Sequence, residues 1–204
     1  MRTPAPAPAL DHLRVLDLST GIAGPVAGMF LADHGADVVK VEPPGGDPAR
    51  DRPGFAAWNR GKRSVIADGD RLTELLGCAD VCIAGAEHLP LTPEAATRAY
   101  PSLIFLHTPP YGRTTPWTGG AESHGLLAAA SGVALRQTSG HDGPVELVYP
   151  HLLYAQGAWA ATCALAALLE RERSGLGQTV TVGGVHGALI TSTSSVTISR
   201  AASL

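Results

Sequence analysis

Cysteine is scarce in this 204-residue sequence, which has three cysteines and no C-x-x-C pair. Cys78, Cys82 and Cys163 therefore supply neither a disulfide framework nor the paired thiolates of a zinc site. Few unpaired cysteines are typical of a reducing compartment, so we expect the protein in the cytoplasm. The histidines match no metal-binding motif either, and we expect no bound metal.

Charged residues are also few. They make up 16% of the chain, against 45% hydrophobic residues, and the formal net charge is -3. This composition excludes a solvated disordered chain and indicates one globular domain. It also lacks the basic surplus of a nucleic-acid-binding protein, so we expect no nucleic-acid partner and a local site for any anionic ligand.

One long hydrophobic run, residues 152–169, approaches the roughly 17–20 residues that a membrane span requires. Gln156 interrupts this run, many of its residues are alanine, and it continues into the charged segment 170–173 before Gly175. A helix that ends in cations followed by glycine is typical of a soluble core. We therefore expect a buried helix and no membrane association.

Short apolar runs alternate with helical patterns through most of the chain. The expected strands are residues 14–18, 36–42, 64–67, 80–84, 103–107 and 178–182. The expected helices are residues 25–34, 70–78, 93–100, 124–132 and 152–169. This alternation predicts an α/β fold with an open, doubly wound, mostly parallel sheet, whose ligands bind beyond the carboxyl ends of the strands.

The two ends of the chain differ from this pattern. Residues 1–10 alternate proline and alanine without the apolar core of a signal peptide, which predicts a disordered leader. Residues 191–204 are rich in serine and threonine and predict a poorly packed tail. The folded domain is therefore expected over residues 11–190.

Two segments are candidates for binding an anion. The turn after the first strand carries Gly21 and Gly24 ahead of a helix, but it matches neither G-x-G-x-x-G nor a P-loop, so a plain tight turn is an equal interpretation. Residues 50–63 contain a third of the basic residues of the chain together with Phe55 and Trp58. This combination fits either a nucleotide-bearing ligand or a solvated loop.

Three histidines stand at element ends, where catalytic groups of α/β proteins often lie. His107 ends an expected strand, and His124 and His151 each open a helical stretch. A neutral imidazole at such a position can act as an acid or a base, although a lone histidine is more often structural.

Five segments, in this order and spacing, resemble the family III CoA-transferases, which include formyl-CoA transferase, carnitine CoA-transferase and 2-methylacyl-CoA racemase. They are residues 14–50 (RVLDLSTGIAGPVAGMFLADHGADVVKVEPPGGDPAR), residues 59–64 (NRGKRS), Tyr111-Gly112 with Pro116, residues 130–132 (ASG) and residues 166–178 (AALLERERSGLGQ). The resemblance implies the Rossmann-like large domain of that family, without its smaller second domain.

The resemblance also implies CoA or an acyl-CoA as the ligand, bound at the carboxyl edge of the sheet. The implied contacts are Thr20, Gly21, Ile22, Ala23, Lys40, Arg50, Arg60, Lys62, Arg63, Tyr111 and Gly112. In the transferases an aspartate attacks the acyl-CoA thioester and forms an acyl anhydride. In the racemase a histidine and this aspartate exchange the α-proton.

The sequence departs from the family at the catalytic position. When Gly157 is aligned with the family glycine, Leu153 stands where the aspartate belongs, and a leucine cannot be a nucleophile. His124 lies one position from the racemase histidine and His151 lies two residues from Leu153, so these two are the candidate catalytic residues. The segment 84–88 departs as well. In the relatives the equivalent segment helps to hold CoA, and here Glu87 adds a carboxylate, which is unfavourable near a pyrophosphate.

Three functions stay open. The favoured one is an acyl-CoA enzyme that performs CoA transfer or acid/base chemistry at the α-carbon of a carboxylic acid thioester. The second is a noncatalytic half-length subunit that binds CoA or completes a heteromeric CoA-transferase, and the third is a repurposed small enzyme of a specialised pathway. Because the second domain is missing, we expect a homo-oligomer, or a heteromer with a complementary CoA-transferase chain, to cover the exposed face.

Overall fold

A computed structural model describes residues 7–85, 92–112, 115–137 and 143–201, with side chains up to residue 192. Its six strands are all parallel and lie in the order β3-β2-β1-β4-β5-β6. They are β1 (Arg14–Asp17), β2 (Asp37–Glu42), β3 (Arg63–Ile66), β4 (Val81–Ala84), β5 (Ile104–His107) and β6 (Thr179–Thr181). The expected α/β fold with a parallel sheet is confirmed, with strand ends shifted by at most one residue.

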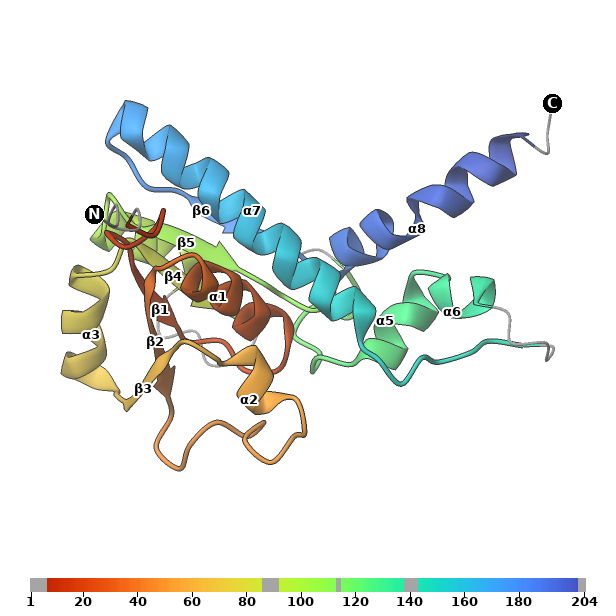
Figure 1. Cartoon of the computed structure of the whole chain (residues 1–204), viewed down its shortest axis with the longest axis horizontal. Coiled ribbons are helices and arrows are strands. Elements are labelled where there is room, and N and C mark those ends of the chain that lie inside the picture. The colour runs from red at the N-terminus through yellow and green to blue at the C-terminus, as the bar shows by residue number, and fades with distance from the viewer. Residues whose placement is uncertain (1–6, 86–91, 113–114, 138–142, 202–204) are drawn as a thin grey trace, which may run out of the picture.

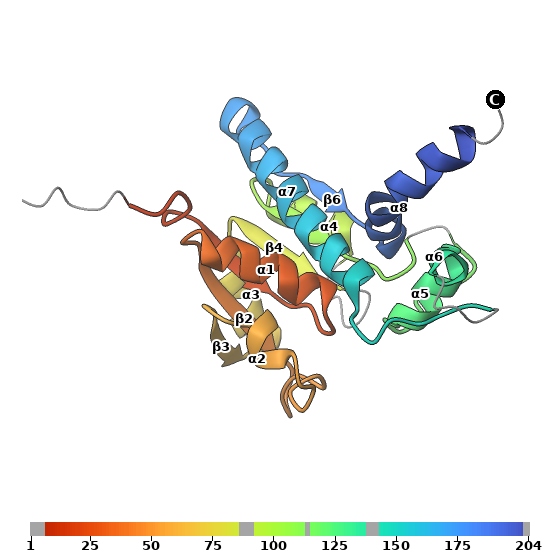
Figure 2. The same ribbon diagram turned by 45° about the vertical axis from the view of Figure 1, so that its right-hand side comes forward.

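Helices cover both faces of this sheet, as a doubly wound fold requires (Figures 1 and 2). One face carries α1 (Ala23–Asp33) and α7 (His151–Ser174), and the other carries α3 (Gly69–Gly77) and α4 (Pro93–Ala99). The strands are apolar on both sides because both sides are buried.

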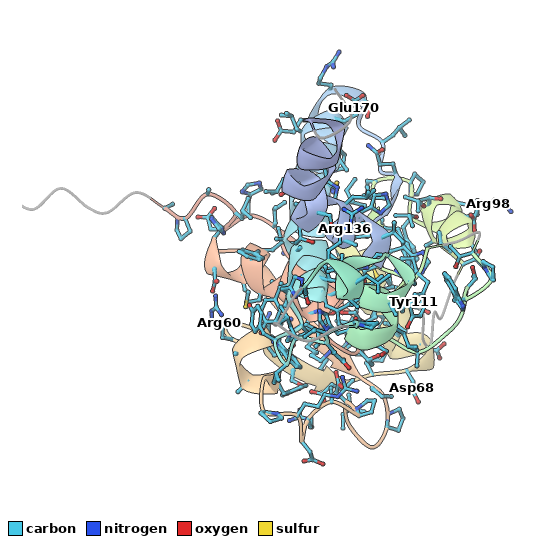
Figure 3. All side chains as sticks on the ribbon, turned by 90° about the vertical axis from the view of Figure 1, so that its right-hand side faces the viewer. Arg60, Asp68, Arg98, Tyr111, Arg136 and Glu170 are labelled. Carbon is cyan, nitrogen blue, oxygen red and sulfur yellow. The ribbon has the colours of Figure 1, made fainter. Side chains whose placement is uncertain are left out.

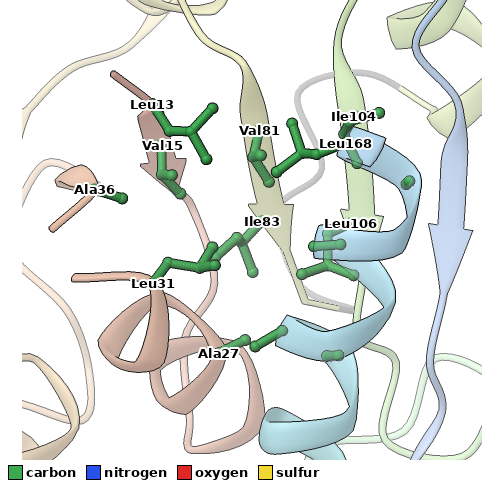
Figure 4. Close-up of a cluster of buried hydrophobic side chains, with 14 of the residues drawn as sticks. Leu13, Val15, Ala27, Leu31, Ala36, Val81, Ile83, Ile104, Leu106 and Leu168 are labelled. Carbon is green, nitrogen blue, oxygen red and sulfur yellow. The ribbon is translucent and has the colours of Figure 1, made fainter. Parts of the chain in front are cut away.

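The two apolar cores alternate along the strands. Val15, Ile83 and Leu106 point to the face under α1 and α7 (Figure 4). Their neighbours Leu16 and Phe105 point to the opposite core under α3 and α4. Each strand therefore contributes to two cores, which is why its sequence reads as a continuous apolar run instead of an alternating one.

Helix α7 is long and apolar enough to cross a membrane, because it has 24 residues and contains an 18-residue window with a mean hydropathy of 1.5. In the structure it packs against α1, at a point where a side chain on Gly157 would lie 2.6 Å from the backbone oxygen of Ala23. It ends at Gly175, whose φ of 72° is the left-handed conformation of a helix C-cap. These contacts confirm the interpretation of α7 as a core helix.

Three further helices were not expected from the sequence. Helices α2 (Phe55–Trp58) and α6 (Val133–Arg136) are single turns, and α8 (Gly184–Ala201) projects away from the body of the protein (Figure 1). Glycine, serine and threonine are weak helix formers, so the composition of α8 gave little signal. The predicted boundary after residue 190 therefore falls inside helix α8, and the expectation of a poorly packed tail stays a prediction.

The start of the folded domain also differs from the prediction. The N–H of Leu10 donates a hydrogen bond to the oxygen of His34 at 3.1 Å, and the Leu10 side chain packs on the core under α1. Leu10 is thus part of the fold and not of a leader. Residues 1–6 and 86–91 lie outside the described residues, so the expectations for the start of the leader and for Glu87 stay predictions.

Candidate functional site

Two cavities lie at the carboxyl edge of the sheet, and Thr20 lines both of them. The first, of about 240 Å³, is lined by Thr20, Gly21, Pro48, Ala49, Arg52, Ala121 and Glu122. The second, of about 230 Å³, is lined by Leu18, Thr20, Val41, Glu42, Pro43, Pro44, Ala67, Asp68, Gly69 and Leu72. Of the predicted ligand contacts, Thr20 and Gly21 therefore lie where ligands of such sheets bind.

The carboxylate of Glu122 occupies the start of helix α1. The backbone N–H groups of Ile22 and Ala23 donate to its two oxygens at 2.7 and 3.3 Å, and the carboxylate rests against Gly21. Ile22 is the N-cap and has no side-chain acceptor, so the helix takes its acceptor from a distant loop. The N–H groups of Ile22 and Ala23, both predicted ligand contacts, are thus already hydrogen-bonded to this acid.

Sequence reasoning missed Glu122, which lies 100 residues from Ile22 along the chain. The available signal was indirect. Helix α1 lacks a Ser, Thr, Asp or Asn at its start and has no acidic residue in its first turn. Its positive end therefore needed an acceptor from elsewhere.

The two predicted lysine contacts are buried in ion pairs. Lys40 Nζ lies 2.8 Å from Asp47 Oδ2 and donates to the backbone oxygen of Ser19 at 2.6 Å. Lys62 Nζ lies 2.7 Å from Asp17 Oδ2, with side-chain exposures of 1% and 0% for the pair. Both ammonium groups have internal partners, which gives them a structural role, and their contact with a ligand stays a prediction.

Burial alone would raise the pKa of Asp17. The positive charges of Lys62 and Lys40, together with hydrogen bonds from Lys62 and Ser19, outweigh that effect and hold the pKa of Asp17 below its ordinary value. Asp17 is the last residue of β1. The pair therefore fixes the loop 59–62 beneath the strand end that carries Thr20 and Gly21.

The predicted arginines divide between the two ends of the sheet. Arg50 pairs with Glu42 at the carboxyl end of β2, with Nε donating to Oε2 at 2.7 Å, and its guanidinium lies 5.3 Å from the Phe55 ring centre. Arg60 and Arg63 pair with acids at the amino edge, Asp33 at the end of α1 and Asp37 at the start of β2. Figure 3 shows Arg60 well apart from Tyr111. The structure therefore does not bring Arg60 and Arg63 to the candidate site.

The two predicted catalytic histidines come together. His124 is the first residue of α5 (His124–Ala130), and His151 is the first residue of α7. Their ring centres lie 5.0 Å apart with the planes at 66°. Ser123 fixes the start of α5 because its side chain accepts a hydrogen bond from the N–H of Leu126 at 3.3 Å. Two helix starts thus place two imidazoles edge to face.

The surroundings of His124 favour a neutral imidazole. Burial lowers its pKa, the neighbouring His151 lowers it further, and Glu146 acts in the opposite direction. Neither ring nitrogen of His124 has a hydrogen-bond partner within the described part of the chain. By contrast, His151 Nε2 lies 3.3 Å from the side-chain nitrogen of Gln137. Both ring nitrogens are buried, and a neutral His124 keeps one of them unprotonated, as a proton acceptor must.

Leu153 lies in an apolar environment. Its side chain is 2% exposed and packs in a cluster with Ile22, Val26 and Leu127. The hydrocarbon therefore completes a core between α1, α5 and α7, at the position that the sequence resemblance predicts for the family aspartate. This position offers no group for covalent attack.

The last two predicted contacts, Tyr111 and Gly112, follow β5. Tyr111 is buried, and its hydroxyl donates to the backbone oxygen of Ala121 at 3.2 Å. Gly112 has a φ of +89°, which favours glycine at this turn. Both residues shape the loop that leads to α5. As for metals, no three His, Cys, Asp or Glu side chains gather as ligands among the residues that the structure describes.

Comparison with known proteins gives consistent results. The model for CoA-transferase family III matches residues 10–203. A probable fatty acyl-CoA transferase of Mycobacterium tuberculosis is 34% identical over 204 residues, covering 89% of this chain and 52% of that protein. A succinyl-CoA:mesaconate CoA-transferase of Haloarcula hispanica is 39% identical over 203 residues, covering 84% of this chain and 50% of that protein. The chain thus spans about half the length of these relatives.

Solved structures agree with the fold. A crystal structure of a hypothetical protein from Mycobacterium tuberculosis matches with a TM-score of 0.85 and 32% identity, covering 95% of this chain and 60% of that one. A CAIB/BAIF family protein from Brucella suis matches with a TM-score of 0.80 and 26% identity, covering 96% of this chain and 59% of that one.

Proposed function

Because this chain belongs to CoA-transferase family III, we propose that it binds an acyl-CoA at the carboxyl edge of its sheet and that His124 and His151 handle a proton of the acyl group. The approach of the two rings to 5.0 Å is the observation that carries the proposal. Cavities beside Thr20 and Gly21, with Arg50 and Arg52 at the same edge, support binding of a nucleotide-bearing thioester.

The proposed chemistry is acid/base rather than covalent. Neutral His124 takes a proton from the α-carbon of the bound thioester, and the electron pair of the C–H bond moves onto the thioester oxygen as an enolate. The resulting imidazolium then returns a proton to the α-carbon. His151 lies beside this ring and helps to hold its pKa down, so that His124 is neutral when the thioester binds.

Isotope exchange tests this chemistry. Incubation of an acyl-CoA that bears α-hydrogens in D₂O should introduce deuterium at the α-carbon, as measured by mass spectrometry. The variants His124→Gln and His151→Gln should each reduce the exchange rate by at least tenfold, a threshold set below the usual contribution of an acid/base group of about 10²–10⁴. His12→Gln is the matched control, because His12 is an exposed histidine remote from the pair. Unchanged exchange in both site variants would overturn the proposal.

A second candidate function is supported by Leu153. With a buried hydrocarbon at the family nucleophile position, the chain fits a noncatalytic subunit that binds CoA and completes a larger transferase. A CoA binding isotherm with clear affinity but no α-deuterium exchange would favour this candidate over the enzyme.

The exposed apolar side chains of α7 and α8 support association with another chain, either a second copy or a complementary CoA-transferase chain. Leu165, Leu169, Leu189 and Ile190 are between 41% and 65% exposed. Sedimentation velocity over a range of protein concentrations tests this proposal. The three free cysteines agree with the proposed cytoplasmic location.

A further inference from the structure

A large apolar cavity lies between α5 and the loop that follows Tyr111. It has a volume of about 760 Å³, which is within the range of about 300–1,000 Å³ for small-molecule sites. It is lined by Tyr111, Pro116, Trp117, Thr118, Gly119, Gly120, Ala121, Ser123, Leu126, Ala129 and Ala130. None of these described lining residues carries a charge.

This cavity adjoins the proposed CoA site. Ala121 lines both this cavity and the smaller one that holds Thr20, Gly21 and Arg52. Ser123 also lines it and directly precedes His124. A ligand that extends from the carboxyl edge past Ala121 therefore reaches the apolar cavity and the residue that precedes His124.

Two aromatic rings give the cavity a defined wall. Tyr111 is buried and is held by its hydrogen bond to the Ala121 oxygen. Trp117 packs against it with ring centres 6.3 Å apart and stays 55% exposed. On the opposite side Leu126 of α5 is 63% exposed. These apolar surfaces face water in the free chain and gain from contact with a hydrocarbon.

From this arrangement we infer that the cavity binds the hydrocarbon chain of the acyl-CoA, so that the protein selects thioesters of apolar acids of medium or greater length. The inference rests on the proposed function and names its substrate class. A dicarboxylic acyl group would bring a second carboxylate into a wall whose described residues offer no cation, and such burial is unfavourable. Each methylene group that leaves water is instead worth about fourfold in affinity, or ~0.8 kcal/mol.

A chain-length series tests the inference. Calorimetry measures the binding of free CoA, acetyl-CoA, butyryl-CoA, octanoyl-CoA and succinyl-CoA to the full chain. We expect octanoyl-CoA to bind at least tenfold more tightly than acetyl-CoA, and succinyl-CoA to bind no more tightly than butyryl-CoA. Equal affinity for all acyl-CoAs, with free CoA still bound, overturns this inference and leaves the proposed function standing. Failure of every member to bind overturns both.

Two variants locate the chain within the cavity. Leu126→Glu puts a charge on its wall, and Ala130→Trp fills its volume without adding charge. Each should reduce octanoyl-CoA affinity at least tenfold and change acetyl-CoA affinity less than twofold. Leu135→Glu is the matched control, because Leu135 is 67% exposed on α6 and does not line the cavity. A chain-length preference that survives both cavity variants overturns the inference.

The cavity has one competing occupant, a second copy of the chain. Sedimentation velocity of Leu126→Glu distinguishes the two. Dissociation of an oligomer together with an unchanged octanoyl-CoA affinity would assign the cavity to self-association and overturn the inference. Loss of octanoyl-CoA affinity without a change in oligomeric state supports it.

Discussion

Replacing Lys62 by methionine should strongly destabilise the protein. The Lys62 ammonium is enclosed by three acceptors, Asp17 Oδ2 at 2.7 Å, the Pro25 oxygen at 2.8 Å and Asn59 Oδ1 at 2.9 Å. The methionine would fill much of the space but leave the Asp17 carboxylate buried next to fewer cations. Breaking one side of a buried pair costs about 3–5 kcal/mol, so we expect a loss of that size in the free energy of unfolding.

A double-mutant cycle separates the ion pair from packing. Asp17→Asn removes the charge that Lys62 balances, so the combination of Asp17→Asn with Lys62→Met should cost less than the sum of the two single variants. Urea unfolding at pH 7, followed by circular dichroism, gives the four free energies. If the single variant does not fold, recovery of a cooperative transition in the double variant still reports the coupling.

The exposed pair of Arg63 with Asp37 provides the control. Its side chains are 70% and 48% exposed, and water screens their interaction, so Arg63→Met should leave the unfolding midpoint nearly unchanged. Equal effects of Lys62→Met and Arg63→Met would refute the structural role of Lys62. A stable Lys62→Met variant that no longer binds CoA would restore the original prediction of a ligand contact.

Three further results are expected. Burial opposes ionisation of Glu42, but hydrogen bonds, led by the one from Arg50, lower its pKa to about 2. The ionised carboxylate therefore stabilises the fold above about pH 4.5, and this stabilisation is lost as the pH falls toward 2. Glu42→Gln should therefore lower the melting temperature at pH 7 and make it less sensitive to acid; a difference from wild type that persists at pH 2 contradicts this. Glu122→Ala removes the acceptor at the start of α1, so the free energy of unfolding should fall by about 1 kcal/mol. Because the freed N–H groups can then bind the ligand, CoA affinity should rise severalfold. Weaker CoA binding would mean that Glu122 itself supports the ligand. Leu153→Asp buries a carboxylate in an apolar core, so calorimetry should show a clear loss of stability. If the variant still folds, a covalent CoA adduct detected by mass spectrometry would show that the family geometry persists.

The strands were predictable because each is apolar on both faces. A short apolar run such as the one around Ile83, flanked by helical patterns, has few interpretations other than a buried parallel strand. The single-turn helices α2 and α6 are too short to show a helical repeat of apolar residues, and α8 has a composition that usually predicts loops. Local sequence pattern therefore identified the sheet better than it identified α2, α6 and α8.

The candidate site was predictable in its residue types more than in its contacts. His124 and His151 could be singled out by position, but only the packing of α5 against α7 shows that their rings meet. A cluster of basic residues in the sequence gives no sign of which ones are buried, and Lys62 is buried in an ion pair with Asp17. The link from Glu122 to the start of α1 depends on tertiary contact across the chain, which no local pattern encodes.

The edge strand β6 has a consequence for how the chain acquires its fold. Strand β5 ends at His107 and its neighbour β6 begins at Thr179, with α5, α6 and α7 between them. The five earlier strands are joined by shorter connections, so the ribosome can release a nearly complete sheet before β6 exists. Pairing over a long sequence separation is entropically costly and slow. The apolar surface destined for α7 thus stays open during synthesis, and it is at this stage that the nascent chain depends most on protection from aggregation.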